Sequence, residues 1–276
     1  MNQPRRHAVN CSILFTDLPL TDRPAAARAA GFEAVEFWWP WPDAPVPSDA
    51  EVDAFCRAVE DAGVRLVALN LYAGDMPAGE RGVLSDPART EEFRRSLAVT
   101  ERIAERTGVR RFNALYGQRR DGLDPAEQDR TAAVNLAYAA GRVAGFGGTI
   151  LVEPLARGLN GAYPLETAAD ALAAVRRARA EGPGNVAFLL DTFHLTVNGD
   201  RDLPAIVRAH AADIGHVQVA DAPGRGRPGT GSVDFAAFFA ALDAAGYDGW
   251  ISLEYRPEGA ATTPGEFAWL RAEVRS

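Results

Sequence analysis

Four short apolar segments of the sequence carry, at or near their ends, one side chain that can bind a metal ion or transfer a proton. The segments are residues 149–153, 186–191, 215–218 and 250–254, and their polar residues are Glu153, Asp191, Gln218 and Glu254. Burying a carboxylate is costly unless it is paired or bound to a metal ion. If the four segments are parallel strands of one barrel, these side chains converge on one point. The pattern therefore predicts a divalent-metal site.

The elements that would position these residues alternate along the whole chain. This alternation predicts βαβ units and a parallel sheet. Eight such units in 276 residues predict an α/β protein, a (β/α)8 TIM barrel, with residues 1–276 as one domain. Strands are expected over residues 8–14, 34–37, 66–71, 111–116, 149–153, 186–191, 216–219 and 250–254, and helices over 22–30, 48–63, 90–106, 125–144, 165–180, from about 203, 234–245 and 264–274.

Two local signals support this arrangement. Ser48 followed by Glu51 is a capping box, which marks the start of a helix. Pro154 favours extended backbone at Glu153, so this glutamate should end its strand rather than begin a helix. Catalytic residues of such barrels lie at the C-terminal ends of strands, where all four candidates fall.

Composition excludes several classes of function. The net charge of −8 argues against nucleic acid as a partner, and no apolar run is long enough to cross a membrane. No lysine is present, which excludes Schiff-base chemistry and a phosphate-loop lysine. Two cysteines, Cys11 and Cys56, cannot build a disulfide framework or a cysteine zinc site. With no signal-peptide core at the N-terminus, a cytoplasmic protein is expected.

At these residues the chain resembles the hydroxypyruvate isomerase family, within the wider xylose-isomerase-like barrels, over nearly its whole length. Any one of the matching motifs would be weak evidence, but their combination is specific. The motifs are residues 31–37 (GFEAVEF), Ala73-Gly-Asp75 with Gly79-Glu-Arg-Gly82, Glu153-Pro154, Asp191-Thr-Phe-His194, residues 215–221 (GHVQVAD), residues 225–231 (RGRPGTG), and residues 246–250 leading to Glu254-Tyr255.

The resemblance implies a metal ion held by Glu153, Asp191, Gln218 and Glu254. It also implies that Glu153 and Glu254 face opposite sides of a small hydroxy-keto acid and pass a proton between adjacent carbons through an enediolate. Hydroxypyruvate and tartronate semialdehyde are the expected substrate and product. Oxygen ligands of this kind suit Mg²⁺ or Mn²⁺, and the absence of a histidine or cysteine ligand disfavours zinc.

Each of these four residues also has a purely structural explanation. The glutamates could form salt bridges at the barrel mouth, Asp191 could cap the helix that follows it, and Gln218 could simply be hydrogen-bonded. Their common register at strand ends favours the metal site.

Further candidates would contact the substrate. His194 is expected to face the substrate's oxygens, the alternative being a structural histidine. Arg225 could bind a substrate carboxylate through its planar guanidinium group, or be a solvated loop residue. Glu80, with its neighbour Arg81, could help to close the pocket, and Asn70 ends the third predicted strand beside the substrate.

The substrate itself stays open at this stage. Leu69 and Ala156 depart from the family pattern, which keeps a ketose 3-epimerase or a 2-oxo-tetronate isomerase on the same site as alternatives. A zinc-cluster DNA-repair endonuclease would need more than the 4 histidines present and a basic face. A non-catalytic sugar-binding barrel would be expected to lack one of the two glutamates. The aromatic run Phe37–Trp41 is either a pocket wall or a subunit contact, so a homo-oligomer stays open too.

Overall fold

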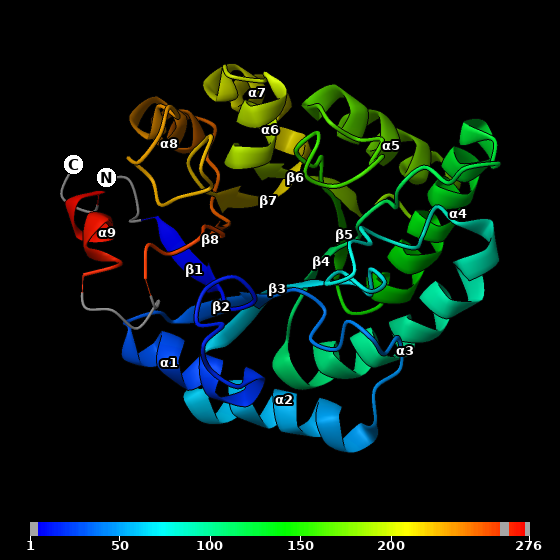
Figure 1. Cartoon of the computed structure of the whole chain (residues 1–276), viewed down its shortest axis with the longest axis horizontal. Coiled ribbons are helices and arrows are strands. Elements are labelled where there is room, and N and C mark those ends of the chain that lie inside the picture. The colour runs from blue at the N-terminus through cyan, green and yellow to red at the C-terminus, as the bar shows by residue number, and fades with distance from the viewer. Residues whose placement is uncertain (1–4, 260–264, 274–276) are drawn as a thin grey trace.

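The computed structural model describes residues 5–259 and 265–273. In this part of the chain, parallel strands β1 to β8 follow one another in sequence order around a closed barrel, and the helices surround it (Figure 1). The strands are β1 Arg6–Asn10, β2 Ala34–Phe37, β3 Arg65–Asn70, β4 Arg111–Asn113, β5 Thr149–Val152, β6 Val186–Asp191, β7 Ile214–Val219 and β8 Trp250–Leu253. The helices are α1 Arg23–Ala29, α2 Asp49–Ala62, α3 Thr90–Thr107, α4 Pro125–Ala144, α5 Ala168–Glu181, α6 Thr192–Asn198, α7 Leu203–His210, α8 Phe235–Ala244 and α9 Ala268–Glu273, with 3-10 helices at Leu20–Asp22, Pro87–Arg89 and Ala211–Asp213.

The predicted (β/α)8 barrel is confirmed, and its closure comes from the pairing of β1 with β8. The strands are apolar because both of their faces are covered, one by the barrel interior and the other by helices. In β6, for example, every residue is buried. A small inner cluster of Leu151, Ala187 and Leu189 fills the barrel below the polar strand ends.

Several predicted boundaries agree with the structure. β2, α4 and β6 have the predicted bounds. The capping box of α2 is present, with the Ser48 hydroxyl accepting from the backbone of Glu51, and the helix ends at Gly63 with a φ of 64°. Only glycine adopts this left-handed conformation readily, which explains why the helix stops there.

Other predicted elements differ. The first strand covers Arg6–Asn10 instead of residues 8–14, because the chain turns away from the barrel after Asn10. Helix α6 was not expected. It begins directly after β6 because the Asp191 carboxylate caps it, accepting a hydrogen bond from the backbone of His194. The last helix covers Ala268–Glu273, and both ends of its predicted range, Pro264 and Val274, lie outside the described residues.

The barrel concentrates polar side chains in one layer. Each strand carries at least one buried polar residue at its C-terminal end or within one residue of it, and one such residue per strand, none more than 4% exposed, makes up this layer. Side chains alternate along a strand, so such a layer points into the barrel on the same level. Its members are Asn10, Glu36, Asn70, Asn113, Glu153, Asp191, Gln218 and Glu254.

Candidate active site

Glu153 follows β5 and is 4% exposed. Its Oε2 atom accepts a hydrogen bond of 2.6 Å from the side chain of Asn113, and its Oε1 atom lies 3.6 Å from His194 Nε2. Burial, followed by the nearby charges of Glu254 and Asp191, raises the pKa of Glu153 well above its ordinary value. A positive charge nearby would therefore strongly stabilise the ionised form of Glu153.

Glu254 follows β8 and is held from several sides. Its Oε1 atom accepts hydrogen bonds from Asn10 Nδ2 at 2.9 Å, from Trp38 Nε1 at 2.7 Å and from Gln218 Nε2 at 3.1 Å. Its Oε2 atom forms an ion pair of 2.5 Å with Arg225. Burial nevertheless raises the pKa of Glu254 to about 8. The Glu254 carboxylate is thus held in one position, and its pKa lies close to neutral pH.

Asp191 and Gln218 are register partners on neighbouring strands, and each leaves one buried oxygen unused. Asp191 Oδ1 caps α6, whereas Asp191 Oδ2 and Gln218 Oε1 have no hydrogen-bond partner in the described part of the chain. Buried polar atoms are normally satisfied, so two such oxygens indicate a missing positively charged partner. The residues present therefore fit a divalent cation.

Glu36, on β2, orients the side-chain amide of Gln218. Glu36 Oε1 accepts from Gln218 Nε2 at 2.5 Å, and Glu36 Oε2 lies 2.8 Å from His216 Nε2. Burial acts to raise the pKa of Glu36, but the charge and hydrogen bond of His216 outweigh it and hold the pKa below its ordinary value. The ionised carboxylate attracts the amide nitrogen of Gln218 and leaves the amide oxygen free. Glu36 and His216 are therefore buried, hydrogen-bonded residues that support Gln218.

His194 has a defined tautomer. Its Nδ1 atom accepts a hydrogen bond of 2.9 Å from the backbone N–H of Ala156. Burial, with the charges of Arg225 and Arg81, lowers the pKa of His194 well below its ordinary value, so the ring is neutral. A neutral ring that accepts at Nδ1 carries its proton on Nε2. His194 therefore presents an N–H donor towards Glu153.

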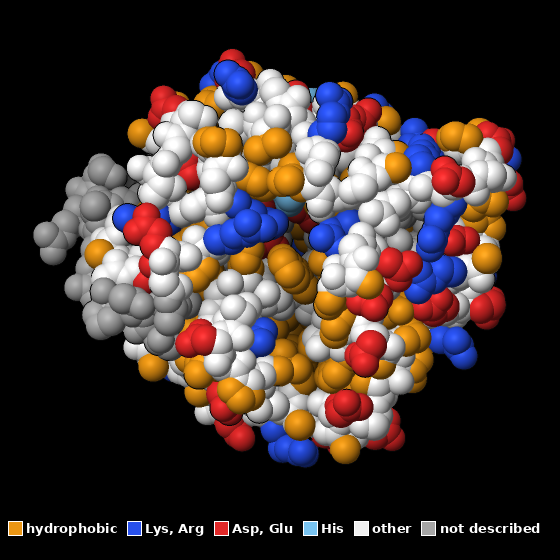
Figure 2. Space-filling model, viewed as in Figure 1, with side chains coloured by type: hydrophobic (Ala, Val, Ile, Leu, Met, Phe, Trp, Pro, Cys, Tyr) orange, Lys and Arg blue, Asp and Glu red, His pale blue; other side chains and the backbone are white. Residues whose placement is uncertain are grey.

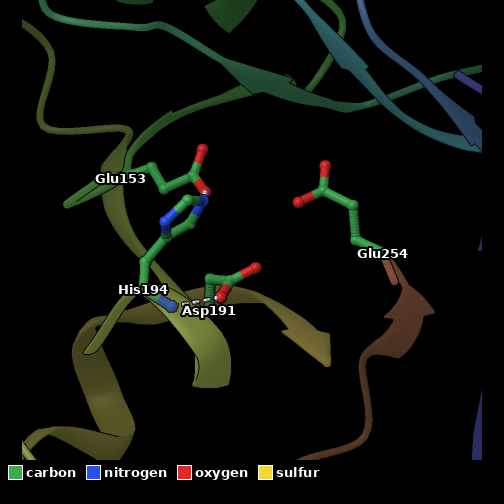
Figure 3. Close-up of side chains that lie close together, drawn as sticks. All are labelled: Glu153, Asp191, His194 and Glu254. Carbon is green, nitrogen blue, oxygen red and sulfur yellow. Dashed lines mark hydrogen bonds and ion pairs between the residues drawn. The ribbon is translucent and has the colours of Figure 1, made fainter. Parts of the chain in front are cut away.

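Together, Glu153, Asp191, His194 and Glu254 form a buried cluster in which one ligand atom of each lies within 4.8 Å of the others. In Figure 3 the carboxylates of Glu153 and Glu254 face each other across an open space, with His194 beside Glu153 and Asp191 below. Three carboxylates this close repel one another unless a cation or protons are shared between them. The cluster is consistent with a divalent-metal site.

A cavity of about 440 Å³ opens above this cluster. Its walls contain Trp38 and Trp39 on one side and three arginines, Arg23, Arg81 and Arg225. Arginine and hydrophobic side chains border a hollow near the centre of the face shown in Figure 2. Burial, followed by the charge of Arg225, lowers the pKa of Arg81 below its ordinary value.

The structure brings most of the predicted substrate contacts to this cavity. Asn70, His194 and Arg225 line it, and Asn70 Oδ1 is one of the buried atoms without a partner in the described residues. Glu80 does not line it. The Glu80 carboxylate instead pairs with Arg89 at 2.5 Å and with Arg120 at 3.3 Å, so a role in substrate binding stays a prediction.

The two departures from the family pattern have different surroundings. Leu69 is fully buried in the hydrophobic core and does not line the cavity. Ala156 is also buried, and its backbone supports His194. Four residues further on, Asn160 lines the cavity, donates to the carbonyl of Ala156 at 2.9 Å and accepts from Arg81 Nε at 2.9 Å. Asn160 thus supplies a side-chain amide in this loop.

Several residues of the site were not assigned from the sequence. Asn10 and Trp38 hold Glu254, and Asn113 holds Glu153. Asn10 and Asn113 lay inside the predicted strands 8–14 and 111–116, and only the structure shows that both end their strands. Trp38 belongs to the aromatic run that was expected to be a pocket wall or a subunit contact, and it lines the cavity. Asn160 lies in a loop without a regular pattern, so only the tertiary structure reveals its contacts.

Comparison with known proteins agrees with this architecture. Residues 24–273 match the family model described as Xylose isomerase-like TIM barrel. A solved structure titled AP endonuclease, family 2, from Brucella melitensis superimposes with a TM-score of 0.86 and 32% sequence identity, covering 98% of this chain and 99% of that one. The site thus lies in a barrel of the xylose-isomerase-like class.

Curated relatives narrow the class. The chain is 50% identical to a Streptomyces coelicolor protein named "Putative hydroxypyruvate isomerase", over 99% of this chain and 98% of the relative. It is 34% identical to the 2-oxo-tetronate isomerase of Cupriavidus necator (96% and 97% covered) and 30% identical to the hydroxypyruvate isomerase of Escherichia coli (96% and 98% covered). This chain belongs to the hydroxypyruvate isomerase family within the xylose-isomerase-like TIM barrels. Among the residues described, no helix has the length and apolar character needed to cross a membrane.

Proposed function

We propose that this protein is a divalent-metal-dependent isomerase that interconverts hydroxypyruvate and tartronate semialdehyde. The observation that carries the proposal is the placement of Glu153 and Glu254, whose carboxylates face each other across the cavity (Figure 3). A carbon atom held between them has a proton acceptor on either side. General acid–base catalysis requires this proximity together with a pKa near the working pH.

The metal ligands in this proposal are Glu153, Asp191, Gln218 and Glu254. The unpartnered oxygens of Asp191 and Gln218 support this set. His194 lies in the same cluster, but a proton on Nε2 makes it a hydrogen-bond donor instead of a ligand. Oxygen donors suit Mg²⁺ or Mn²⁺. When bound, such an ion acts as a Lewis acid that polarises the substrate's carbonyl group.

The chain's own residues move the proton. One glutamate removes a proton from C3 of hydroxypyruvate, and the electron pair of that C–H bond forms a double bond between C3 and C2 as the C2 carbonyl becomes an oxyanion. Return of the proton to C2, with transfer of the hydroxyl proton from the C3 oxygen to the C2 oxygen, gives the aldehyde. His194, with its N–H near Glu153, is placed to donate to a substrate oxygen during this exchange.

Arg81 and Arg225 support an acid as the substrate. Both line the cavity, and only Arg225 has a carboxylate partner, Glu254, in the described residues. The guanidinium group of Arg81 instead donates to Asn160 and to backbone carbonyls. A carboxylate in the cavity would offset the repulsion between these two arginines, whereas a neutral ketose would not.

A 2-oxo-tetronate is the second candidate substrate. The cavity of about 440 Å³ is large for a three-carbon acid and leaves space for a fourth carbon with its hydroxyl group. The similarity to the 2-oxo-tetronate isomerase of Cupriavidus necator supports the same choice. The chemistry at Glu153 and Glu254 would be unchanged, because only the group beyond C3 differs.

A reducing compartment, the cytoplasm, is proposed as the location. Cys11 and Cys56 are both buried and both free. Burial raises the pKa of both thiols, which keeps them protonated and unreactive.

Hydrogen exchange tests the proposed function. The purified protein with Mn²⁺ is incubated in D₂O with hydroxypyruvate, a 2-oxo-tetronate or a neutral ketose, and the recovered compounds are analysed by NMR. Deuterium should enter hydroxypyruvate or the four-carbon acid and should be lost after EDTA treatment. Exchange into the ketose alone, or into none of the three, would contradict the proposal.

A further inference from the structure

A second cavity, of about 600 Å³, lies at the other end of the barrel. It is lined by residues at the N-terminal ends of β1, β3, β4, β7 and β8, so it opens on the face opposite the strand ends that carry Glu153 and Glu254. Four arginines take part in its lining: Arg6, Arg65, Arg110 and Arg111. The chemistry proposed above uses none of them.

Three of these arginines are held by neutral groups. The guanidinium carbon of Arg6 lies 5.4 Å from the ring centre of Trp250, and that of Arg110 lies 5.2 Å from the ring centre of Phe146. Arg111 donates to the carbonyl of Gly215 at 3.1 Å. In residues 5–259 and 265–273, none of the four guanidinium groups forms an ion pair. Stacking and carbonyl contacts orient these side chains but leave their charge uncompensated.

The lining of this cavity is positively charged, although the protein as a whole is negatively charged. Asp248 is the one carboxylate residue among the described lining residues, against four arginines. The whole chain nevertheless carries a net charge of −8. Several arginines elsewhere are paired with carboxylates, such as Arg106 with Asp53 and Glu60. A concave, like-charged group of this kind concentrates field lines and attracts anions.

We propose that this cavity binds a small organic polyanion carrying at least two negative charges, as phosphate or carboxylate groups. The planar guanidinium group matches both oxyanions through paired hydrogen bonds. Arg6 and Arg110 are already positioned by aromatic rings, so less side-chain entropy is lost when an anion binds. Four arginines against the single Asp248 in the lining favour a ligand with more than one negative charge.

A purely structural role for these arginines explains less of the geometry. Residues at the N-terminal face of such barrels commonly contribute to stability. Arg111 fits that description, because it bridges β4 to β7 and to Thr149 of β5. Arg65, however, is exposed and has no ion pair in the described residues, so stability does not explain its place at the cavity. The neighbouring positive charges destabilise the empty cavity and favour an occupied one.

Isothermal titration calorimetry on the full-length Mn²⁺-loaded protein tests the proposal. Fructose 1,6-bisphosphate serves as the phosphate-ester probe and tricarballylate as the tricarboxylate probe. At least one of them should bind with one site per chain, and the affinity should fall as NaCl is raised. The probe that binds more tightly identifies which oxyanion the cavity prefers. Failure of both probes to bind at millimolar concentration would overturn the proposal.

Variants test whether the probe binds in this cavity. The double variant Arg6→Gln/Arg65→Gln should weaken binding at least tenfold. A matched control, Arg28→Gln/Arg57→Gln, removes the same charge from exposed positions that do not line the cavity and should change affinity less than twofold. If loss of the stacking between Arg6 and Trp250 lowers the unfolding temperature, Arg65→Gln alone should still weaken binding about threefold. Equal affinity in wild type and in the Arg65→Gln variant would overturn the assignment.

Discussion

Gln218 Nε2 donates a hydrogen bond of 2.5 Å to Glu36 Oε1, from β7 to β2 across the barrel. This contact determines which end of the Gln218 amide is free. Because Glu36 is ionised, it binds the amide nitrogen and leaves Gln218 Oε1 buried and without a partner in the described residues. Residues behind a ligand commonly set its orientation in this way.

Replacing Glu36 with Gln should weaken Mn²⁺ binding about 10- to 100-fold, the usual effect of losing such an orienting partner. The amide of Gln218 would then lack the charge that selects its orientation. Calorimetric titration of the chelator-treated protein with Mn²⁺ measures the affinity. Glu33→Gln, an exposed neighbour, is the matched control and should bind normally. Equal affinity in the Glu36 variant would show that Gln218 does not depend on this contact.

Replacing Glu153 or Glu254 with Gln should lower turnover by about 10²- to 10⁴-fold, the range expected for a general acid or base. The glutamine side chain keeps the shape but cannot accept the substrate's proton. Turnover and deuterium exchange are measured together at saturating Mn²⁺, so that weaker metal binding does not imitate a lost proton acceptor. Glu91→Gln, at an exposed position on α3, should leave both rates unchanged. Normal exchange in either active-site variant would refute its assignment.

Stability of the metal-free protein should decrease as the pH rises. Burial raises the pKa of Asp191 to about 6 and that of Glu254 to about 8, above their ordinary values. The folded state therefore binds these protons more tightly than the unfolded chain. The stability they contribute is complete below about pH 4 and is lost as the pH passes through the two folded-state values.

The unfolding temperature of EDTA-treated protein, measured by calorimetry between about pH 5 and pH 9, tests this pH dependence. Mn²⁺ should restore stability most at high pH, where the carboxylates are ionised and repel one another. Glu254→Gln should flatten the upper part of the curve, because the neutral amide does not titrate. A curve for metal-free wild type that rises over this range would contradict the raised pKa values.

Replacing Arg81 with Gln should raise KM for hydroxypyruvate by about 10- to 100-fold, because hydrogen bonds to charged groups contribute about 1.5–3 kcal/mol. The kcat should change much less, since Arg81 does not contact Glu153 or Glu254 in the described structure. Steady-state kinetics separate the two constants. Arg28→Gln, an exposed arginine on α1, is the control. An unchanged KM would remove Arg81 from the recognition of the substrate's carboxylate.

Helix α6 could not be predicted from the local sequence pattern. Its residues, Thr192–Asn198, include β-branched side chains with low helix propensity, and no helix was predicted over this range. Tertiary contacts decide the outcome, because Asp191 caps the helix and Thr192 donates to the carbonyl of Ala220 beside β7. Strands such as β6 were easier to predict, since their residues form a continuous apolar run.

The positions of the Arg81 and Glu80 side chains could not be predicted from the local sequence either. The two residues are adjacent in sequence, yet Arg81 lines the cavity and Glu80 is drawn to Arg89 and Arg120. No periodicity distinguishes such neighbours in a loop. The positions of distant partners decide which side chain points inward.

The sequence by itself determined the barrel and the level at which Glu153, Asp191, Gln218 and Glu254 lie. The physical reason is that apolar runs alternate with helices, and that parallel strands bring their C-terminal ends to one face. Only the tertiary structure decided the protonation and orientation of these groups. Burial, like charges and contacts across the barrel set the raised pKa of Glu254 and the free oxygen of Gln218, and these depend on residues far apart in the chain.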